Sequence, residues 1–367
     1  MNPDELTLGI EEEYQIIDPD TRELTSYISE FLEKGRMVFR DQVKPEFLQS
    51  QIEIGSKVCR DIDEARQEVT RLRRMVYEIG EKSNHKIVAA GTHPFSRWQE
   101  QEITDKDRYK SLVADLQFIA RRLLIFGMHV HVGIPNRELR IDIMNQVSYF
   151  LPHILALSTS SPFWQGENTG LKSYRSVVFA DLPRTGLPEP FDSADEYEHL
   201  VQTLMHTHCI DEPTKIWWDV RPHPRFPTLE FRICDCATKI EEVLSITALI
   251  QAVVAKLIQL RRRNQSWRTY RHVLIEENKW RAIKDGLDGR LIDFGKEEEV
   301  PLRTLIEELL VIIDDVVDPL GVRREIEHIH TMLAEGTSAD RQLKTFQESG
   351  SVEAVVDRLA EDTVEGC

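Results

Sequence analysis

The sequence has few cysteines, no excess of basic residues and no long uninterrupted apolar run. Its 367 residues include 5 cysteines, an odd number at irregular spacings, which argues against a disulfide framework and for reduced thiols. Lys and Arg number 46 against 63 Asp and Glu, giving a formal charge of −17. This acidic balance argues against nucleic acid or an anionic membrane as a general partner.

Signals for export and membrane insertion are lacking as well. The first residues contain neither the basic nor the apolar region of a secretory signal, which predicts a cytoplasmic protein. The most apolar stretch, residues 243–260, contains serine, threonine, glutamine and lysine, so we expect a buried helix there and no membrane crossing. Cys234-x-Cys236 has no second cysteine pair, which argues against a zinc site.

Several familiar catalytic signatures are also missing. The segment GENTGLKS (166–173) looks like a phosphate loop, but no lysine follows its second glycine directly. There is no G-x-S-x-G elbow for a nucleophilic serine. No repeat of fixed period and no long linker interrupts the chain. We therefore predict one domain over 1–367, with the chemistry in about 1–238 and a mainly helical remainder in about 239–367.

Apolar residues at helical spacing predict several helices. Residues 62–79 carry such a pattern, with Asp61 placed to cap the helix and Glu64 three residues further on. Further helices are expected over about 105–126, 240–263, 301–317 and 351–359.

Four short segments between these helices contain nearly all the candidate functional residues. Three of them alternate polar and apolar residues, and alternate side chains of a strand point to opposite faces. Each of the three strands should therefore have one apolar face and one reactive face. The residues predicted to share the reactive faces are Glu11 with Glu13, His129 with His131, and Glu230 with Arg232.

The fourth segment, KPEFLQSQIEIGS, contributes Glu46 and Glu53. Their odd spacing would put them on opposite faces of one unbroken strand. If both serve one site, the chain must bend, bulge or change structure between them.

Carboxylates gathered on one sheet face repel each other unless a cation neutralises them. Glutamates converging with a histidine suggest divalent ions, and oxygen ligands suit Mg²⁺ or Mn²⁺. Such ions bridge nucleotide phosphates, and a nearby arginine such as Arg232 could hold a phosphate. Taken singly, each segment also has an ordinary structural interpretation. The glutamates of LGIEEEYQ are typical of a solvated sheet face, and His129 with His131 is typical of hydrogen-bonded structure. Glu230 with Arg232 is typical of an exposed ion pair.

Six stretches between Leu8 and Asp235 resemble the carboxylate–amine ligases of the glutamate–cysteine ligase type 2 branch, which is distantly similar to glutamine synthetase. The matching stretches are LGIEEEYQIIDP, VKPEFLQSQIEIGSKVC, AAGTHPF, FGMHVHVGIP, LSTSSPFWQGENTGLKSYRS and WWDVRPHPRFPTLEFRICD. The resemblance implies an α+β fold of the glutamine synthetase type, a curved antiparallel sheet with helices packed behind it. Strands in which apolar and polar residues alternate, so that one face is buried, are themselves typical of antiparallel sheets.

The resemblance also implies a set of site residues. One Mg²⁺ or Mn²⁺ ion would be held by Glu13, Glu46 and Glu53. The other would be held by Glu11, His129 and Glu230. The phosphates of ATP would be bound by Arg232, Arg221 and Arg225. Arg232 is also a catalytic candidate. The substrate candidates are His131, Asn168, Lys172 and Arg175, and Arg175 is the second catalytic candidate.

The implied reaction is ATP-dependent amide formation through an acyl phosphate, typically of the γ-carboxylate of glutamate. Similar chains are often described as weak glutamate–cysteine ligases, so the amine is left open between cysteine and another small molecule. A non-catalytic nucleotide or metal sensor is the alternative from another class, since it would keep the ligands without releasing ADP. A β-barrel metalloenzyme fits the long helices poorly. The sequence neither requires nor excludes a homodimer.

Overall fold

The computed structural model describes residues 6–29, 31 and 42–367. A seven-stranded sheet lies at its centre, with the strands in the order β10, β11, β5, β1, β3, β2 and with β4 also paired to β1. Every pairing in this sheet is antiparallel, as the alternating segments predicted. The strands are β1 (Leu8–Ile17), β2 (Val43–Pro45), β3 (Gln51–Gly55), β4 (Lys86–Val88), β5 (Gly127–Gly133), β10 (Val220–Pro222) and β11 (Thr228–Asp235).

Among the described residues, three two-stranded sheets lie outside the central sheet. They are formed by β6 (Phe163–Trp164) with β7 (Glu167–Asn168), β8 (Thr185–Gly186) with β9 (Trp217–Trp218), and β12 (Arg290–Asp293) with β13 (Glu298–Pro301). Short 3₁₀ helices occur at η2 (Trp98–Glu100), η3 (Ser148–Phe150), η4 (Pro213–Lys215) and η5 (Gly286–Asp288).

Helices form most of the remaining regular structure of the described residues. They are α2 (Ile62–Lys82), α3 (Asp107–Leu116), α4 (Phe118–Arg121), α5 (Arg137–Val147), α6 (Leu151–Ser158), α7 (Tyr174–Ala180), α8 (Ala194–His206), α9 (Ile240–Arg262), α10 (His272–Asp285), α11 (Leu302–Leu320), α12 (Arg323–Glu335), α13 (Ser338–Ser349) and α14 (Val352–Val364).

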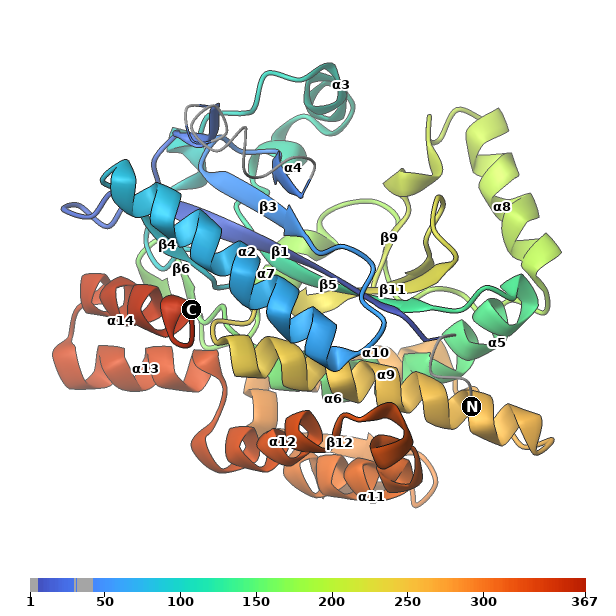
Figure 1. Cartoon of the computed structure of the whole chain (residues 1–367). Helices are drawn as coiled ribbons and strands as arrows, with labels where there is room; N and C mark the ends of the chain where they lie inside the picture. The colour runs from blue at the N-terminus through green and yellow to red at the C-terminus, as the bar shows by residue number, and fades with distance from the viewer. Residues whose placement is uncertain (1–5, 30, 32–41) are drawn as a thin grey trace.

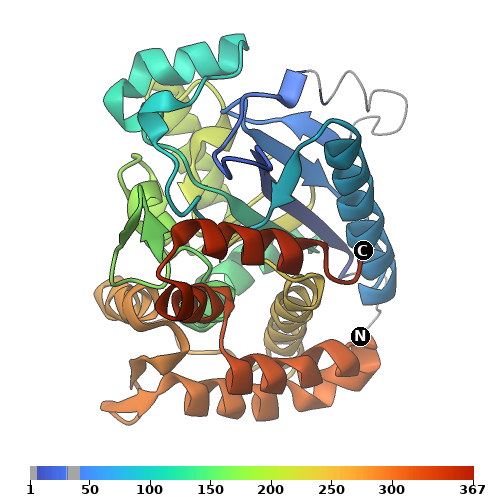
Figure 2. The same ribbon diagram turned by 90° about the vertical axis from the view of Figure 1, so that its left-hand side faces the viewer.

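One face of the sheet is covered by helices. α2 packs on β1 and β4, α9 on β5, α6 on β11 and α14 on β4. Figure 1 shows α9 running beneath the strands, with α11 and α12 below it, and Figure 2 shows the same layers from the side. Ile10, Val130 and Phe231 join residues of α9 in one apolar core. The apolar face of each strand therefore points to the helices, and the polar face is left for the site.

Most of the predicted helices are present. Asp61 caps α2 as expected, because its side chain accepts a hydrogen bond from the backbone N–H of Glu64. The helix expected over 105–126 is wrong in extent, since Gln117 has a φ of 50° and separates α3 from α4. Residues beyond Arg122 leave the helix and lead to Phe126, which is fully buried and directly precedes β5.

α9 has the length and apolar composition of a membrane-spanning helix. It lies inside the protein, however, with 83% of its most apolar window buried by the surrounding helices and sheet. The prediction of a buried core helix is therefore confirmed.

Strand β11 contains an irregularity that bears on the site. Phe231 pairs with Val130, but the next pairs are Cys234 with Met128 and Asp235 with Gly127. Two residues of β11, Arg232 and Ile233, thus lie opposite the single residue His129 of β5, which is a β-bulge. The backbone N–H of Arg232 donates instead to the carbonyl of Asp219, at 2.7 Å.

Candidate active site

A cavity of about 390 Å³ lies over the polar face of the sheet. Its volume is within the range of small-molecule sites, about 300–1,000 Å³. The residues of the sequence-predicted set that line it are Glu11, Glu13, Glu46, Glu53, His129, Arg175, Arg221, Arg225, Glu230 and Arg232. Residues that are far apart in the chain are brought together here by strand pairing.

The first group of carboxylates is formed by Glu13, Glu46 and Glu53. Glu13 of β1 pairs in register with Glu53 of β3. Glu46 follows the last residue of β2, and the chain turns before β3 begins. One oxygen of each carboxylate lies within 4.8 Å of the other two. The bend that the spacing of Glu46 and Glu53 required is therefore present, and it makes the two side chains converge.

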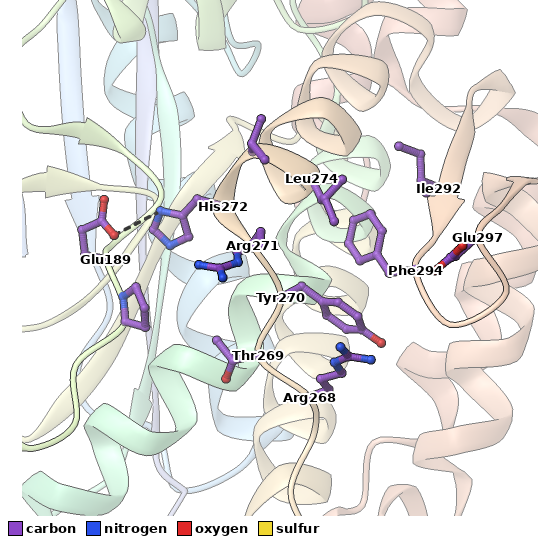
Figure 3. Close-up of a pocket in the computed structure, with 12 residues that line it drawn as sticks. Glu189, Arg268, Thr269, Tyr270, Arg271, His272, Leu274, Ile292, Phe294 and Glu297 are labelled. Carbon is purple, nitrogen blue, oxygen red and sulfur yellow. Dashed lines mark ion pairs between the residues drawn. The ribbon is translucent and has the colours of Figure 1, made fainter.

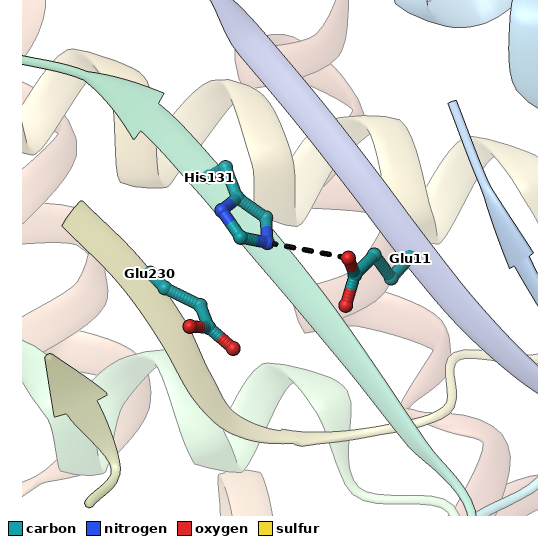
Figure 4. Close-up of side chains that lie close together, drawn as sticks. All are labelled: Glu11, His131 and Glu230. Atoms are coloured by element: carbon teal, nitrogen blue, oxygen red, sulfur yellow. Dashed lines mark ion pairs between the residues drawn. The ribbon is translucent and has the colours of Figure 1, made fainter. Parts of the chain in front are cut away.

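The second group comes from β1, β5 and β11 and comprises Glu11, His131 and Glu230 (Figure 4), whose ligand atoms also lie within 4.8 Å of one another. His131 Nε2 lies 3.7 Å from Glu11 Oε1 and has no hydrogen-bond partner among the described residues. Thr228 Oγ1 lies 3.1 Å from the other ring nitrogen of His131. A buried nitrogen that faces two carboxylates is well placed to act as a ligand of a cation.

His129, which the resemblance assigned to this ion, lies beside the second group. Its Nδ1 is 3.1 Å from Glu11 Oε2 and 4.0 Å from Glu230 Oε1. Burial and the charge of Arg232 lower the pKa of His129 to about 4, so the ring is neutral at neutral pH. The structure thus brings both histidines to the site. His129 lies nearer to Glu11, whereas His131 forms the group in which all three ligand atoms lie within 4.8 Å of one another.

The first group holds more negative charge than its surroundings balance. Burial and the charge of Glu46 raise the pKa of Glu13 to about 7. Burial, with the charges of Glu11 and Glu46, raises the pKa of Glu53 well above its usual value. Lys44 Nζ, 3.7 Å from Glu53 Oε1, offsets part of this charge. Carboxylates held together in this way are a favourable site for a divalent cation.

Glu230 lies between two guanidiniums. Arg221 Nε donates to Glu230 Oε2 at 2.9 Å, and Arg232 Nη1 donates to Glu230 Oε1 at 2.6 Å. Burial alone would raise the pKa of Glu230, but the charges of Arg232 and Arg221 hold it well below its usual value. Arg232 Nε has no partner among the described residues, so part of this guanidinium is still available to an anion.

Arg175 at the start of α7 is a second incompletely bonded guanidinium. It is 3% exposed, its Nε is unpartnered among the described residues, and its contacts to the carbonyls of Arg232 and Ile233 are long, at 3.3 and 3.5 Å. Gly127 begins β5 directly beneath it, and a side chain there would collide with the guanidinium.

Asp235 holds the residues at the start of α7 in place through hydrogen bonds to serines. Its Oδ2 accepts hydrogen bonds from the Ser161 hydroxyl at 2.7 Å and from the backbone N–H of Ser160 at 2.9 Å. Its Oδ1 accepts from the Ser173 hydroxyl at 2.8 Å. Ser161 Oγ in turn accepts from the backbone N–H of Arg175, which sets where that side chain begins.

The other predicted arginines differ in their contacts. Besides Glu230, Arg221 donates to the carbonyls of Thr214 and Ile216, so its guanidinium is already fully engaged. Arg225 is 73% exposed at the rim of the cavity, 3.8 Å from Glu212. Arg225 can therefore move to meet an anion, whereas Arg221 is held as a structural partner of Glu230.

Two predicted substrate residues lie away from the cavity. Lys172 forms an ion pair with Asp340 of α13 and does not line the cavity. Asn168 is exposed in the β6–β7 hairpin, where its side chain accepts a hydrogen bond from the backbone N–H of Gly170. The structure does not bring either side chain to the carboxylates.

Several lining residues were missed by the sequence analysis. The hydroxyl of Tyr109 donates to Glu46 Oε2 at 3.3 Å, and the ring of His223 packs edge-on against His131 at 5.3 Å between centroids. Lys44 could have been found from the sequence, because it lies two residues before Glu46 and alternate residues of a strand share one face. In the β2–β3 register Lys44 pairs directly with Glu53. Tyr109 lies on a separate helix, and no local pattern connects it to the site.

A second cavity, of about 930 Å³, lies between the start of α10 and the β12–β13 hairpin (Figure 3). Tyr270 and Phe294 form its aromatic wall, and His272 lies 3.6 Å from Glu189. Neither group of three metal-type ligands found among the described residues belongs to it. The catalytic candidate is therefore the cavity over the sheet.

Known proteins match almost the whole chain. The model of the family described as "Glutamate-cysteine ligase family 2 (GCS2)" matches residues 7–358. A Chloroflexus aggregans protein named "Putative glutamate--cysteine ligase 2" is 56% identical over 360 residues, covering 98% of this chain and 92% of that protein. A Herpetosiphon aurantiacus protein of the same name is 53% identical, with 98% and 94% of the two chains covered.

Solved structures share the fold at low identity. The glutamate–cysteine ligase of Francisella tularensis, in complex with AMP, has a TM-score of 0.72 at 13% identity, with 98% of this chain and 89% of that chain covered. A bifunctional glutathione synthetase from Pasteurella multocida has a TM-score of 0.71 at 14% identity, with 99% and 53% covered. These matches confirm the predicted α+β fold with its antiparallel sheet and helical C-terminal part. From the family match and the identity of these relatives, the chain is a member of glutamate–cysteine ligase family 2 and a ligase of the glutamate–cysteine ligase type.

Proposed function

We propose that this chain is an ATP-dependent ligase that joins the γ-carboxylate of L-glutamate, or of a glutamate-like acid, to an amine. The observation that carries the proposal is the convergence of two carboxylate-rich groups and two incompletely bonded guanidiniums at one cavity. The AMP bound to the structurally similar Francisella tularensis enzyme supports a nucleotide as one ligand.

The donor sets fit two divalent cations. The residues that would hold Mg²⁺ or Mn²⁺ are Glu13, Glu46 and Glu53 in one group, and Glu11, His131 and Glu230, with His129 beside them, in the other. Carboxylate oxygens with a neutral imidazole suit these hard ions, and the unpartnered His131 Nε2 fits a ligand role. When bound, the ions supply the positive charge that lets a carboxylate approach polyanionic ATP.

The first step forms an acyl phosphate. A carboxylate oxygen of the acid attacks the γ-phosphorus of ATP, the bond from that phosphorus to the β–γ bridging oxygen breaks, and ADP leaves. Arg232 keeps an unpartnered Nε for a phosphate oxygen while Glu230 holds its Nη1. Arg225 is free to approach the phosphates at the rim, because it is exposed there.

The second step forms the amide bond. The amine nitrogen attacks the carbonyl carbon of the acyl phosphate, phosphate leaves with the bonding electrons, and the nitrogen loses a proton. Arg175 would orient the acid or the acyl phosphate, because its buried guanidinium lacks a partner at Nε.

All five cysteines are free, which supports a reducing compartment such as the cytoplasm.

The test is ADP release with Mg²⁺ and ATP, measured with glutamate alone and with glutamate paired with each of a panel of amines. Mass detection of an amide tied to one acid–amine pair would support the ligase and identify its substrates. A product with cysteine, or only with another amine, would decide between those acceptors. A folded protein that binds ATP and Mn²⁺ but releases no ADP with any pair would favour a nucleotide or metal sensor instead.

A further inference from the structure

A buried ion pair lies directly behind the carboxylates of β1. Glu12 is placed between Glu11 and Glu13 in the strand, so its side chain points to the opposite, helix-covered face. This side chain is 0% exposed, and it pairs with Arg73 of α2, whose side chain is 2% exposed. The carboxylate is held further by the hydroxyl of Tyr14, which donates to Glu12 Oε2 at 2.7 Å.

Arg73 is bonded to segments other than β1. Its Nη2 donates to the carbonyl of Ala237 at 2.9 Å, and its Nη1 donates to those of Thr238 at 2.6 Å and Thr363 at 3.1 Å. Its Nε lies 3.1 Å from the hydroxyl of Tyr14 and 3.3 Å from Glu12 Oε2. One guanidinium therefore links β1 to the residues that follow β11 and to the last turn of α14.

We propose that Arg73 is a positioning residue for the reaction, because it fixes β1 relative to β11 from the face opposite the site. This inference rests on the proposed function. The second cation group depends on that relation, since Glu11 comes from β1 while Glu230 comes from β11. Arg73 does not line the cavity, so it acts only through the backbone that carries these carboxylates.

Stability alone is a weak reason for such a pair. The cost of removing two charges from water often equals or exceeds their attraction, and apolar replacements of buried pairs are often as stable. A rigid, five-donor fork that reaches three segments offers something that an apolar cluster does not, namely a fixed geometry. Residues that orient metal ligands from behind typically change metal affinity about 10- to 100-fold when they are altered.

The test compares two variants at the pair with a matched control on the same helix. Arg73→Lys keeps the charge and loses the fork, and Tyr14→Phe removes only the hydroxyl between the two partners. Arg66→Lys is the control, because Arg66 lies two turns earlier in α2 and pairs with Glu241 and Glu325 of α9 and α12. Mn²⁺ affinity would be measured by calorimetry on each full-length protein, well below its melting temperature.

We expect Arg73→Lys to weaken Mn²⁺ binding about 10- to 100-fold and Tyr14→Phe to weaken it less. Arg66→Lys should lower the melting temperature and leave Mn²⁺ affinity unchanged. Wild-type affinity in folded Arg73→Lys and Tyr14→Phe, or an equal loss in Arg66→Lys, would overturn the positioning role. If Arg73→Lys does not fold, Tyr14→Phe decides. A wild-type protein that binds Mn²⁺ but forms no amide would overturn the ligase while leaving this comparison valid.

Discussion

Replacing Glu13 by glutamine is predicted to stabilise the metal-free protein at high pH while weakening its response to Mg²⁺. Glu13 carries one of three carboxylates whose oxygens lie within 4.8 Å of one another. Glutamine keeps the shape of the side chain and an oxygen that can accept the 2.6 Å hydrogen bond from the backbone N–H of Gly127. The substitution therefore removes a charge with little change in packing.

The size of the effect follows from the pKa of Glu13, which burial and Glu46 raise from 4.5 to about 7. As pH rises from 4.5 to 7, the unfolded chain releases a proton that the native chain retains, so the native state loses stability. At about 1.4 kcal/mol per pKa unit, the loss above pH 7 is about 3 kcal/mol. Glu13→Gln should recover about this amount at pH 8 and less than about 1 kcal/mol at pH 5.

The assay is urea unfolding of chelator-treated protein at pH 5 and pH 8, followed by the same measurement with Mg²⁺. Mg²⁺ at 100 times its dissociation constant should stabilise the wild type by about 2.7 kcal/mol and the variant by less. Glu11→Gln is the matched control on the same strand face. Burial raises the pKa of Glu11, but its interactions with His129 and His131 outweigh burial and lower the pKa, so this variant should be destabilised at pH 8. A Glu13→Gln protein that gains nothing at pH 8, or gains equally at both pH values, would refute the reasoning.

Three further outcomes are expected. Glu53→Gln should abolish Mg²⁺-dependent ADP release while the circular dichroism spectrum is kept, and full activity would contradict the two-cation site. Arg232→Lys should lower kcat/KM for ATP about 10- to 100-fold, because an ammonium cannot replace the guanidinium fork; unchanged kinetics would make Arg232 structural. His93 Nδ1 accepts a hydrogen bond from the N–H of Ser96 at 2.9 Å, and burial lowers the pKa of His93 from 6.5 to about 4. The wild type should therefore lose up to about 3 kcal/mol as pH falls through this range, and His93→Asn, compared by urea unfolding, should lose less; equal losses would exclude His93 as the cause.

The polar faces of the strands could be predicted from the sequence. A strand has a side-chain period of two, so the alternation in 8–17, 127–134 and 228–234 was enough to place the glutamates and histidines on one side of each strand. The buried character of α9 and the cap at Asp61 were also predictable, because composition and capping chemistry are local.

Relations between strands could not be predicted in this way. The turn that brings Glu46 to Glu53, and the grouping of His131 with Glu230, depend on pairing registers between distant segments. The ion pair of Lys172 with Asp340 depends on the docking of α13, 168 residues further along the chain. A sequence pattern relates residues that are near each other in the chain, whereas these contacts are set by packing of the whole fold.

The bulge in β11 makes one strand serve two purposes with opposite alternation. Before the bulge, the even-numbered Glu230 faces the site; after it, the odd-numbered Asp235 pairs with Gly127 and holds the serines beneath Arg175. Regular pairing of the same residues from Phe231 onward would instead place Asp235 on the face covered by helices, because alternate residues of a strand point to opposite sides. The one extra residue between Phe231 and Cys234 therefore lets Glu230 and Asp235, the anchor of Arg175, lie on the same side of one strand although their spacing is odd.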